Sequence, residues 1–216
     1  MKRDSGGRSM ADVSMAQIAR RGVGGLFDAR GRDDRMQYWL FLILVFGPLV
    51  VLQFIIQFAL TIPPLDLVMA TRPGVPAAGA PFLQHQFRAM VTVTYASLGL
   101  HLLGALLLLT ATARRLHDRG RGGWWALALP GAVFATGLGQ ARRMAEMAER
   151  MPQILAEIEK KVRPDFADLL SFPAKMQASA EPDWPSVLGG LILLWLVIEL
   201  VRAGTAGPNR YGPPQR

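Results

Sequence analysis

The sequence predicts an all-α integral membrane protein, built as a bundle of four membrane-spanning helices. Long apolar blocks without charged side chains occur along its 216 residues. Short motifs rich in arginine and aromatic residues lie beside these blocks. Lys and Arg gather on the cytoplasmic flank of spanning helices, whereas Trp and Tyr settle at headgroup depth. The motifs therefore mark where the chain meets the membrane surfaces.

The first two apolar blocks are long enough to cross a membrane as helices. Residues 39–62 carry no charge, and residues 91–113 are uncharged and interrupted only by His101. A helix needs about 20 apolar residues to cross about 30 Å of hydrocarbon. We predict a span over each block. Pro63 and Pro64 end the first helix, because proline has no N–H to continue the helical hydrogen bonds.

The other two apolar blocks are shorter. As helices, residues 124–139 and 187–201 would each extend about 24 Å, which is less than the hydrocarbon thickness. Trp184 and Pro185 can lengthen the last block, and the long side chain of Arg202 can reach the headgroups from its end. We predict that both blocks span the membrane. The alternative is a pair of re-entrant helices, which would keep the C-terminal tail on the same side.

The charge distribution predicts that both termini lie in the cytoplasm (N-in, C-in). Most of the 24 Lys and Arg residues precede the first span, separate the second span from the third, or follow the fourth. The positive-inside rule puts these segments on the cytoplasmic side. We divide the chain into a polar, partly disordered tail (residues 1–23) and a membrane domain (residues 24–216). The first span is too long for the apolar core of a signal peptide, so we expect it to stay as an anchor.

The insert between the third and fourth spans, residues 140–184, has a helical pattern of its own. Its apolar residues recur at steps of three and four, with charged residues between them. This pattern predicts an amphipathic helix over residues 142–163 on the extracytoplasmic side. One interpretation is a helix that lies on the bilayer or on the bundle. The other is a helix that binds a protein partner.

Several function classes are disfavoured. The net charge of +8 does not indicate nucleic-acid binding, because the basic residues flank apolar blocks instead of forming one continuous stripe. Without cysteine the chain has no disulfides, thiolate catalysis or Cys-type metal sites. His117 and Asp118 are adjacent, so their side chains diverge, and His85 and His101 complete no metal-binding pattern. We therefore predict no catalytic residue, no metal and no cofactor.

The arginine-rich motifs all fall on the predicted cytoplasmic side, where they can meet. A guanidinium group binds phosphate and carboxylate oxygens through two parallel hydrogen bonds. A cluster at headgroup depth therefore suits an anionic lipid or a phosphorylated ligand. The candidate residues for this site are Arg32, Arg35, Arg114, Arg115, His117, Asp118, Arg119, Asn209, Arg210 and Tyr211. The alternative is that the arginines only mark topology and form ion pairs within the chain.

Polar residues inside the predicted spans are further candidates, because such residues are rare in membranes and often functional. They are Gln53, Gln57, His101 and Glu199. Gln53 and His101 fall at the same depth when the first span runs outward and the second inward. We expect a hydrogen bond between their side chains. A proton path or pore is the alternative.

The motifs taken together resemble the domain of unknown function 805 family of small bacterial inner-membrane proteins. The residues that carry the resemblance are Phe27 and those of the segments 31–39, 114–119, 123–125 and 204–213. The resemblance implies a multi-pass protein with four helices in the bacterial inner (cytoplasmic) membrane. It implies no established activity.

We therefore expect a non-enzymatic membrane protein that acts through lipid or protein contacts at its cytoplasmic face. Its expected partners are membrane lipids, including anionic ones, and no nucleic acid. The alternative is a transporter or channel for a small solute, which would need more polar residues in the spans than this chain has. A membrane enzyme is the third interpretation.

Overall fold

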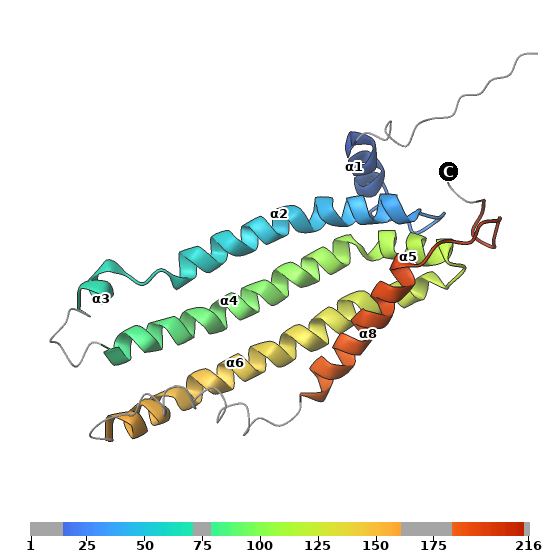
Figure 1. Ribbon diagram of the computed structural model, residues 1–216. Coiled ribbons are helices and arrows are strands. Elements are labelled where there is room, and N and C mark those ends of the chain that lie inside the picture. Colours follow the sequence, from blue (N-terminus) through green and yellow to red (C-terminus); the bar gives the residue numbers. More distant parts are fainter. Residues whose placement is uncertain (1–14, 71–78, 161–182, 214–216) are drawn as a thin grey trace, which may run out of the picture. The chain divides into compact units, whose positions relative to one another are not determined.

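The structure is a computed structural model that describes residues 15–70, 79–160 and 183–213 (Figure 1). Within these ranges the chain is helical, with turns and short connections and no strand, so the predicted all-α class is confirmed. The chain divides into two compact units, and each long helix contributes residues to both. Unit 1 comprises Met1–Val50, Leu102–Gly131 and Ile192–Arg216, and unit 2 comprises Val51–His101 and Ala132–Leu191.

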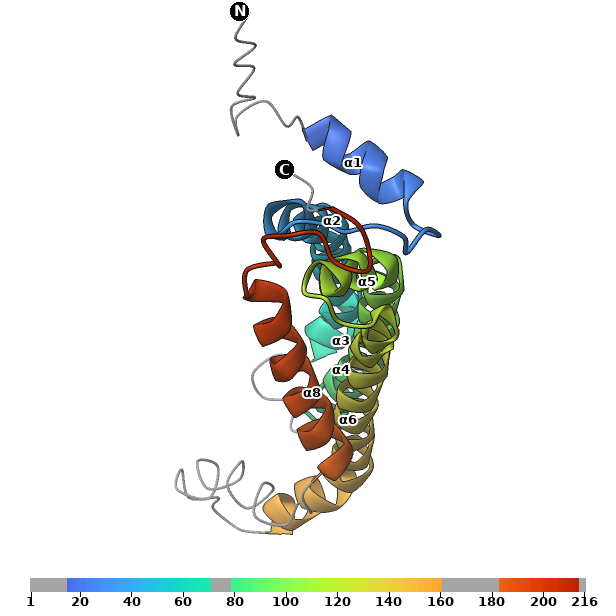
Figure 2. The same cartoon turned by 90° about the vertical axis from the view of Figure 1, so that its right-hand side faces the viewer.

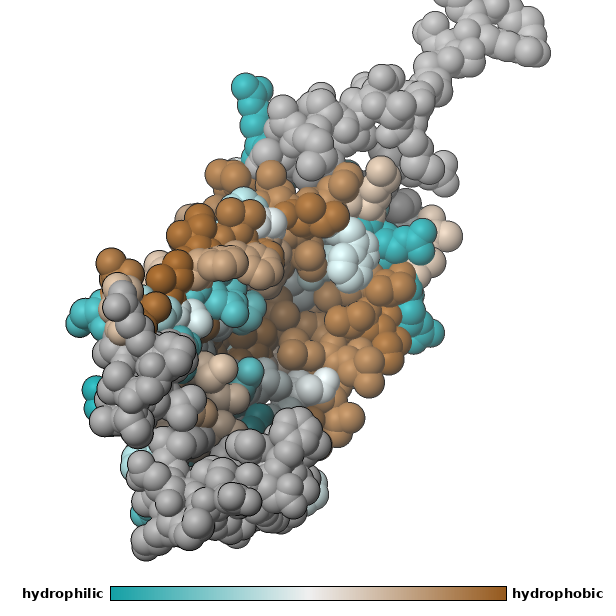
Figure 3. All heavy atoms as spheres, turned by 60° about the vertical axis from the view of Figure 1, so that its left-hand side comes forward, coloured by the Kyte–Doolittle hydropathy of each residue, from teal (hydrophilic) through white to brown (hydrophobic). Residues whose placement is uncertain are grey.

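Three of the described helices are long and apolar enough to cross a membrane. They are α2 (Arg35–Thr61), the Gln84–Leu107 part of α4 (Gly79–Leu107), and α8 (Trp184–Val201). Few of their side chains are buried, and large apolar residues such as Phe58 are exposed. Figure 3 shows such apolar side chains in brown over much of the visible face. Because this surface is unfavourable in water, the helices indicate a membrane protein.

The helices α2 and α8 match the predicted spans 39–62 and 187–201 apart from a few residues at their ends. The second predicted span, 91–113, differs more. Helix α4 ends at Leu107, and the chain resumes one residue later as α5 (Leu109–Asp118). Residues 114–118, which begin the second arginine-rich motif, are therefore helical and do not form a loop.

The third apolar block has a different structure from the one predicted. Its first residues form a 3-10 helix, η3 (Gly123–Leu127), and the rest begins α6 (Ala128–Lys160). Helix α6 is not among the three candidate spans, because the charges of Arg142 and Arg143 follow soon after its apolar residues. The apolar length of the block is thus divided between two helix types.

The predicted amphipathic helix 142–163 is not a separate element. Its residues up to Lys160 continue α6 without interruption, and residues 161–163 lie outside the described part. The prediction of two helices was wrong because Gln140 and Ala141, between the apolar and charged segments, are good helix formers. Even Pro152 stands inside α6.

The core of unit 1 forms where α2, α5 and α8 pack together (Figure 2). Tyr38 and Phe41 contribute from α2, Leu116 from α5, and Leu196 and Leu200 from α8. Helix α1 (Met15–Gly24) approaches the same core through a glycine: a Cβ atom at position 22 would overlap the ring of Phe41. These contacts bring the segments before α2, around α5 and after α8 to one place.

The end of α5 has a defined cap. The Gly120 N–H donates to the His117 carbonyl at 2.9 Å, and the Arg121 N–H donates to the Leu116 carbonyl at 2.9 Å. Gly120 has a φ of 69°, which glycine adopts without steric strain. Together these bonds form a Schellman motif. The motif sets the directions in which Arg119 and Arg121 leave the helix.

In unit 2, the short helix α3 (Leu65–Ala70) follows α2, and a side-chain hydrogen bond joins α2 to α4. Gln53 Nε2 donates to Ser97 Oγ at 2.5 Å. The predicted bond between Gln53 and His101 is therefore wrong: the amide bonds to a hydroxyl one turn from His101, whose own side chain is exposed. The residue of α4 that bonds to Gln53 lies within one turn of the predicted His101. Depth along the helix did not predict which side chain of α4 faces α2, because that depends on the rotation of α4 about its axis.

The contact of α6 with the start of α8 depends on Asp183. Its carboxylate accepts hydrogen bonds from Ser186 Oγ and from the Arg143 guanidinium of α6. The Gly139 backbone comes close to this carboxylate, because it has no Cβ. The hydroxyl of Ser186 keeps the pKa of Asp183 below its usual value, and Arg143 adds to this effect. The ionised side chain thus ties the two helices of unit 2 together.

Candidate functional site

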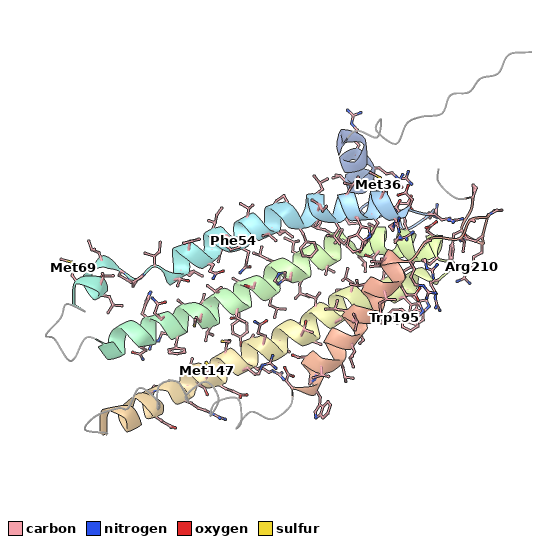
Figure 4. The ribbon with its side chains drawn as sticks, in the orientation of Figure 1. Met36, Phe54, Met69, Met147, Trp195 and Arg210 are labelled. Carbon is pink, nitrogen blue, oxygen red and sulfur yellow. The ribbon has the colours of Figure 1, made fainter. Side chains whose placement is uncertain are left out.

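The three arginine-rich motifs meet in unit 1. The first follows α1, the second lies on α5, and the third is the loop after α8. Figure 4 shows nitrogen-bearing side chains gathered at this end of unit 1, near Arg210. The buried charged side chains of the described chain are all found here: Arg32, Asp33, Arg114, Arg115, Asp118 and Glu199.

Asp118 is the centre of the site. Its Oδ1 accepts hydrogen bonds from Arg32 Nε at 3.0 Å and from Arg32 Nη2 at 2.7 Å. Its Oδ2 accepts a hydrogen bond from Arg115 Nη1. Both arginines are buried, with only 1% and 0% of their surface exposed. The backbone of Gly204 lies against this carboxylate, where any Cβ atom would overlap the Oδ2 atom.

Arg32 also binds the C-terminal loop. Its Nη1 donates to the carbonyl oxygens of Gly207 and Gly212 at 3.0 and 3.1 Å. Its Nη2 donates to the Thr205 carbonyl at 2.7 Å and to its hydroxyl at 3.0 Å. A single side chain from the N-terminal part of the chain thus holds the loop that follows α8.

Arg115 caps the end of α8. Its Nε donates to the Leu200 carbonyl at 3.1 Å, and its Nη2 donates to the Arg202 carbonyl. The last carbonyls of a helix have no partners within the helix and carry partial negative charge, so a cation here is stabilising. Burial lowers the pKa of Arg115, and Asp118 opposes this shift. Guanidinium is so basic that the side chain stays charged.

Asp33 and Arg114 form a second buried pair. Arg114 Nε donates to Asp33 Oδ2 at 2.7 Å, and Arg114 Nη1 donates to the carbonyls of Gly25 and Asp28 at 2.8 and 2.6 Å. Arg21 of α1 approaches the other oxygen of Asp33 at 3.3 Å. This pair holds the connection between α1 and α2 against α5.

His117 lies between the first and third motifs. Its Nδ1 is 3.2 Å from the Gly31 carbonyl, and because a carbonyl only accepts, Nδ1 carries the proton. The ring of Tyr211 stacks on the imidazole at 3.8 Å between centroids. The guanidinium carbon of Arg210 lies 4.7 Å from the centroid of the Tyr211 ring. Asn209 Nδ2 donates to the His117 carbonyl at 2.9 Å. Burial lowers the pKa of His117, and Arg210 adds to this, so the imidazole is neutral at pH 7.

Glu199 stands in the last turn of α8, near three arginines. Arg121 Nη2 lies 3.4 Å from Oε1, Arg202 Nη1 lies 3.6 Å from Oε1, and Arg119 Nε lies 3.6 Å from Oε2. The side chain of Glu199 is only 4% exposed. Its position at the end of α8 explains why an ionised residue occurs in an apolar helix.

Comparison with known protein families gives a match over residues 26–213, to the family described as protein of unknown function (DUF805). The chain belongs to this family. The resemblance inferred from the motifs is therefore confirmed, and the match includes every residue of the site from Asp28 to Gly212. Comparisons with curated proteins and with solved structures gave no match.

Most of the predicted site residues meet in this DUF805 chain, but several of them bind other groups of the chain instead of being free to bind a ligand. The guanidinium groups of Arg32, Arg114 and Arg115 bind carboxylates and carbonyls of the chain itself. The predicted residues that surround or adjoin them are His117, Asp118, Arg119, Asn209, Arg210 and Tyr211. Arg35 is exposed and stands outside this network.

Sequence reasoning considered ion pairs of Arg35 or Arg115 with Asp33, Asp118 or Glu199; the pair Arg115–Asp118 forms, whereas Asp33 pairs with Arg114. It missed Arg121 and Arg202 as neighbours of Glu199, although Arg121 lies two residues after Arg119 and Arg202 three residues after Glu199. In the described part of the chain, no group of three His, Asp or Glu side chains is placed to hold a metal ion.

Replacing Asp118 with Asn should destabilise the fold of this DUF805 protein strongly. The change leaves Arg32 and Arg115 buried without a counter-charge, which costs about 3–5 kcal/mol. Asp28→Asn is the control, because among the described residues its exposed carboxylate accepts only the Arg30 N–H, and its effect should stay within about 0.5 kcal/mol. Thermal unfolding in detergent compares the two variants. Equal melting temperatures would contradict the central role of Asp118.

Acidification should loosen the C-terminal loop. The pKa of His117 is below its ordinary 6.5, so its neutral form stabilises the fold fully above pH 6.5 and this contribution is lost as the pH falls further. Hydrogen exchange of residues 203–212, corrected for its intrinsic pH dependence, should be faster near about pH 5.5 than near about pH 7.5. His117→Phe keeps a stacking ring and cannot titrate. An equal pH response in this variant would exclude His117 as the cause.

Proposed function

We propose that the chain is a four-span protein of the bacterial inner membrane with both termini in the cytoplasm. We further propose that it is not an enzyme and that it acts through lipid or protein contacts of its cytoplasmic face. The observation that supports the four-span topology is the contact of Arg32 with Asp118 and with the loop at Thr205.

The contact supports an even number of crossings. Arg32 precedes α2, Asp118 ends α5, and Thr205 follows α8. Segments in direct contact cannot lie on opposite sides of a bilayer. The stretch from Asp118 to Thr205 must then cross an even number of times. Since α8 can cross once, at about 27 Å for its length, a second crossing is needed, and α6 is the long helix described between them.

The geometry of the histidine and the aspartate supports a non-enzymatic role. The Nδ1 of His117 donates to a backbone carbonyl, its ring is covered by Tyr211, and its Nε2, which carries the lone pair, lies against the backbone of Gly123. Both oxygens of Asp118 accept from guanidinium groups. A general base needs a free lone pair within reach of a substrate proton. In this arrangement the two groups serve the fold.

The exposed residues around the buried network form the proposed contact surface. Phe27 is fully exposed on a backbone that Arg114 and Thr110 hold through the Gly25 carbonyl. A fixed, exposed aromatic ring beside arginines suits the headgroup region of an anionic membrane or the apolar centre of a protein interface. Exposed arginines near it in the sequence are Arg20, Arg21, Arg30 and Arg35.

Reporter fusions test the topology. Fusions at residues 75 and 165 should both read as extracytoplasmic, and a fusion after Tyr211 should read as cytoplasmic. These outcomes follow from four crossings with the three motifs on one side. A cytoplasmic signal at residue 165 would mean that α6 does not cross, and the four-span topology would be wrong.

A photo-crosslinking amino acid at position 27 tests the contact surface. In intact inner membranes it should form adducts with a lipid or a protein, because the side chain of Phe27 is fully exposed. The same amino acid at position 41 is the control, since Phe41 is 5% exposed and packs inside unit 1. Adducts no more frequent at position 27 than at position 41 would contradict the proposed contacts.

A further inference from the structure

The buried acids of unit 1 differ in how completely they are bonded. Asp118 accepts hydrogen bonds of 3.0 and 2.7 Å from Arg32, and Asp33 accepts one of 2.7 Å from Arg114. Glu199 accepts a single long one, from Arg121 at 3.4 Å. Its Oε2 is buried and, within the described chain, makes no hydrogen bond, because Arg119 Nε faces it from 3.6 Å. Glu199 is therefore less tightly bonded than the other two acids.

The surroundings of Glu199 carry excess positive charge. Arg119, Arg121 and Arg202 lie within 3.6 Å of its carboxylate. The Nε of Arg119 makes no hydrogen bond in the described part and faces the Glu199 carboxylate. One carboxylate neutralises one of the three guanidinium groups. The site therefore attracts an anion that accepts hydrogen bonds.

The site is preformed and open. The Schellman motif fixes Arg119 and Arg121 at the end of α5, and Arg119 donates to the Ala203 carbonyl. The side chains of Arg121 and Arg202 are 51% and 59% exposed. A ligand can thus reach the guanidinium groups from the surface, whereas Arg32 and Arg115 are closed off in the interior.

Tryptophans locate the site at headgroup depth. Trp195 lies one helical turn before Glu199 on α8, and its ring is 5.0 Å from that of Trp125. The ring of Trp124 stacks on Trp125 at 4.0 Å and is 63% exposed. Figure 4 shows Trp195 on α8 at the same end of unit 1 as Arg210. Because Trp prefers the membrane interface, lipid phosphates and this arginine group share one level.

We propose that Arg119, Arg121 and Arg202 bind the phosphodiester of an anionic phospholipid with a glycerol headgroup, a phosphatidylglycerol. The acyl chains lie along Trp124 and the neighbouring rings. This assignment rests on the proposed function, because it needs the motif end of unit 1 to face a leaflet.

The charge balance selects this headgroup among common ones. A choline or ethanolamine headgroup would add a cation beside three guanidinium groups, where like charges repel. A glycerol headgroup is uncharged, so the phosphodiester reduces the positive excess.

Tryptophan quenching by brominated lipids tests the assignment. The full chain, with Trp39→Phe and Trp184→Phe, is placed in phosphatidylcholine nanodiscs, so that fluorescence comes from the three rings near Glu199. The same low mole fraction of brominated phosphatidylglycerol, phosphatidylethanolamine or phosphatidylcholine is then included. Phosphatidylglycerol should quench most. Equal quenching by the three lipids would overturn the proposal.

Matched variants separate the site from general attraction to charge. Arg121→Gln and Arg202→Gln should each weaken the preference for phosphatidylglycerol about threefold to tenfold, the loss of one partly exposed charge-assisted bond. Arg142→Gln removes the same charge from an exposed arginine of α6 outside unit 1 and should leave the preference unchanged. Equal weakening by Arg142→Gln would also overturn the proposal.

Soluble glycerol phosphate identifies the source of the phosphate. It should not relieve the quenching at millimolar concentration, since the acyl chains contribute to binding; relief would overturn the assignment to a lipid. The topology reporters are read separately. If the reporters indicate four crossings but phosphatidylglycerol is not preferred, only the lipid assignment is wrong. If residue 165 is cytoplasmic, the proposed topology is wrong.

Discussion

The carboxylate of Asp118 holds two buried guanidinium groups, and the rest of unit 1 depends on this charge. Without it Arg32 and Arg115 would be unpaired charges in the interior, and moving an unpaired charge out of water is far more costly than any single contact returns. Once paired, each arginine has further N–H groups to donate. Arg32 uses them on the loop at Thr205, and Arg115 uses them on the end of α8. One acid therefore joins segments that are far apart in sequence.

The distribution of the remaining charges separates a structural network from a contact region. The pairs around Asp33 and Asp118 are buried and well bonded, so they contribute to the fold and their carboxylates are not available to a ligand. Glu199 has more arginines around it than it can neutralise, and two of them are exposed. The same residue type thus serves two purposes. Burial and the number of acids nearby decide which purpose applies to each arginine.

The same network bears on the membrane topology. Hydropathy alone identifies three strong spans, because the apolar part of α6 is short and is followed by Arg142 and Arg143. The contacts of Arg32 add a condition that hydropathy does not contain, since they bring the chain before α2 and the chain after α8 together. The proposed four-span topology satisfies this condition, because an even number of crossings returns the chain to the same side.

The sequence by itself determined the helical class, the apolar helices α2 and α8, the meeting of the arginine motifs and the family. These depend on local composition and on spacing along the chain, which a sequence displays directly. Only the tertiary structure decided that Asp118 binds both Arg32 and Arg115, that Gln53 bonds to Ser97, and that α6 runs on unbroken. Partner choice depends on the rotation of each helix about its axis and on the exact end of each apolar block. Neither quantity is encoded in local spacing, because small changes in rotation exchange one neighbour for another.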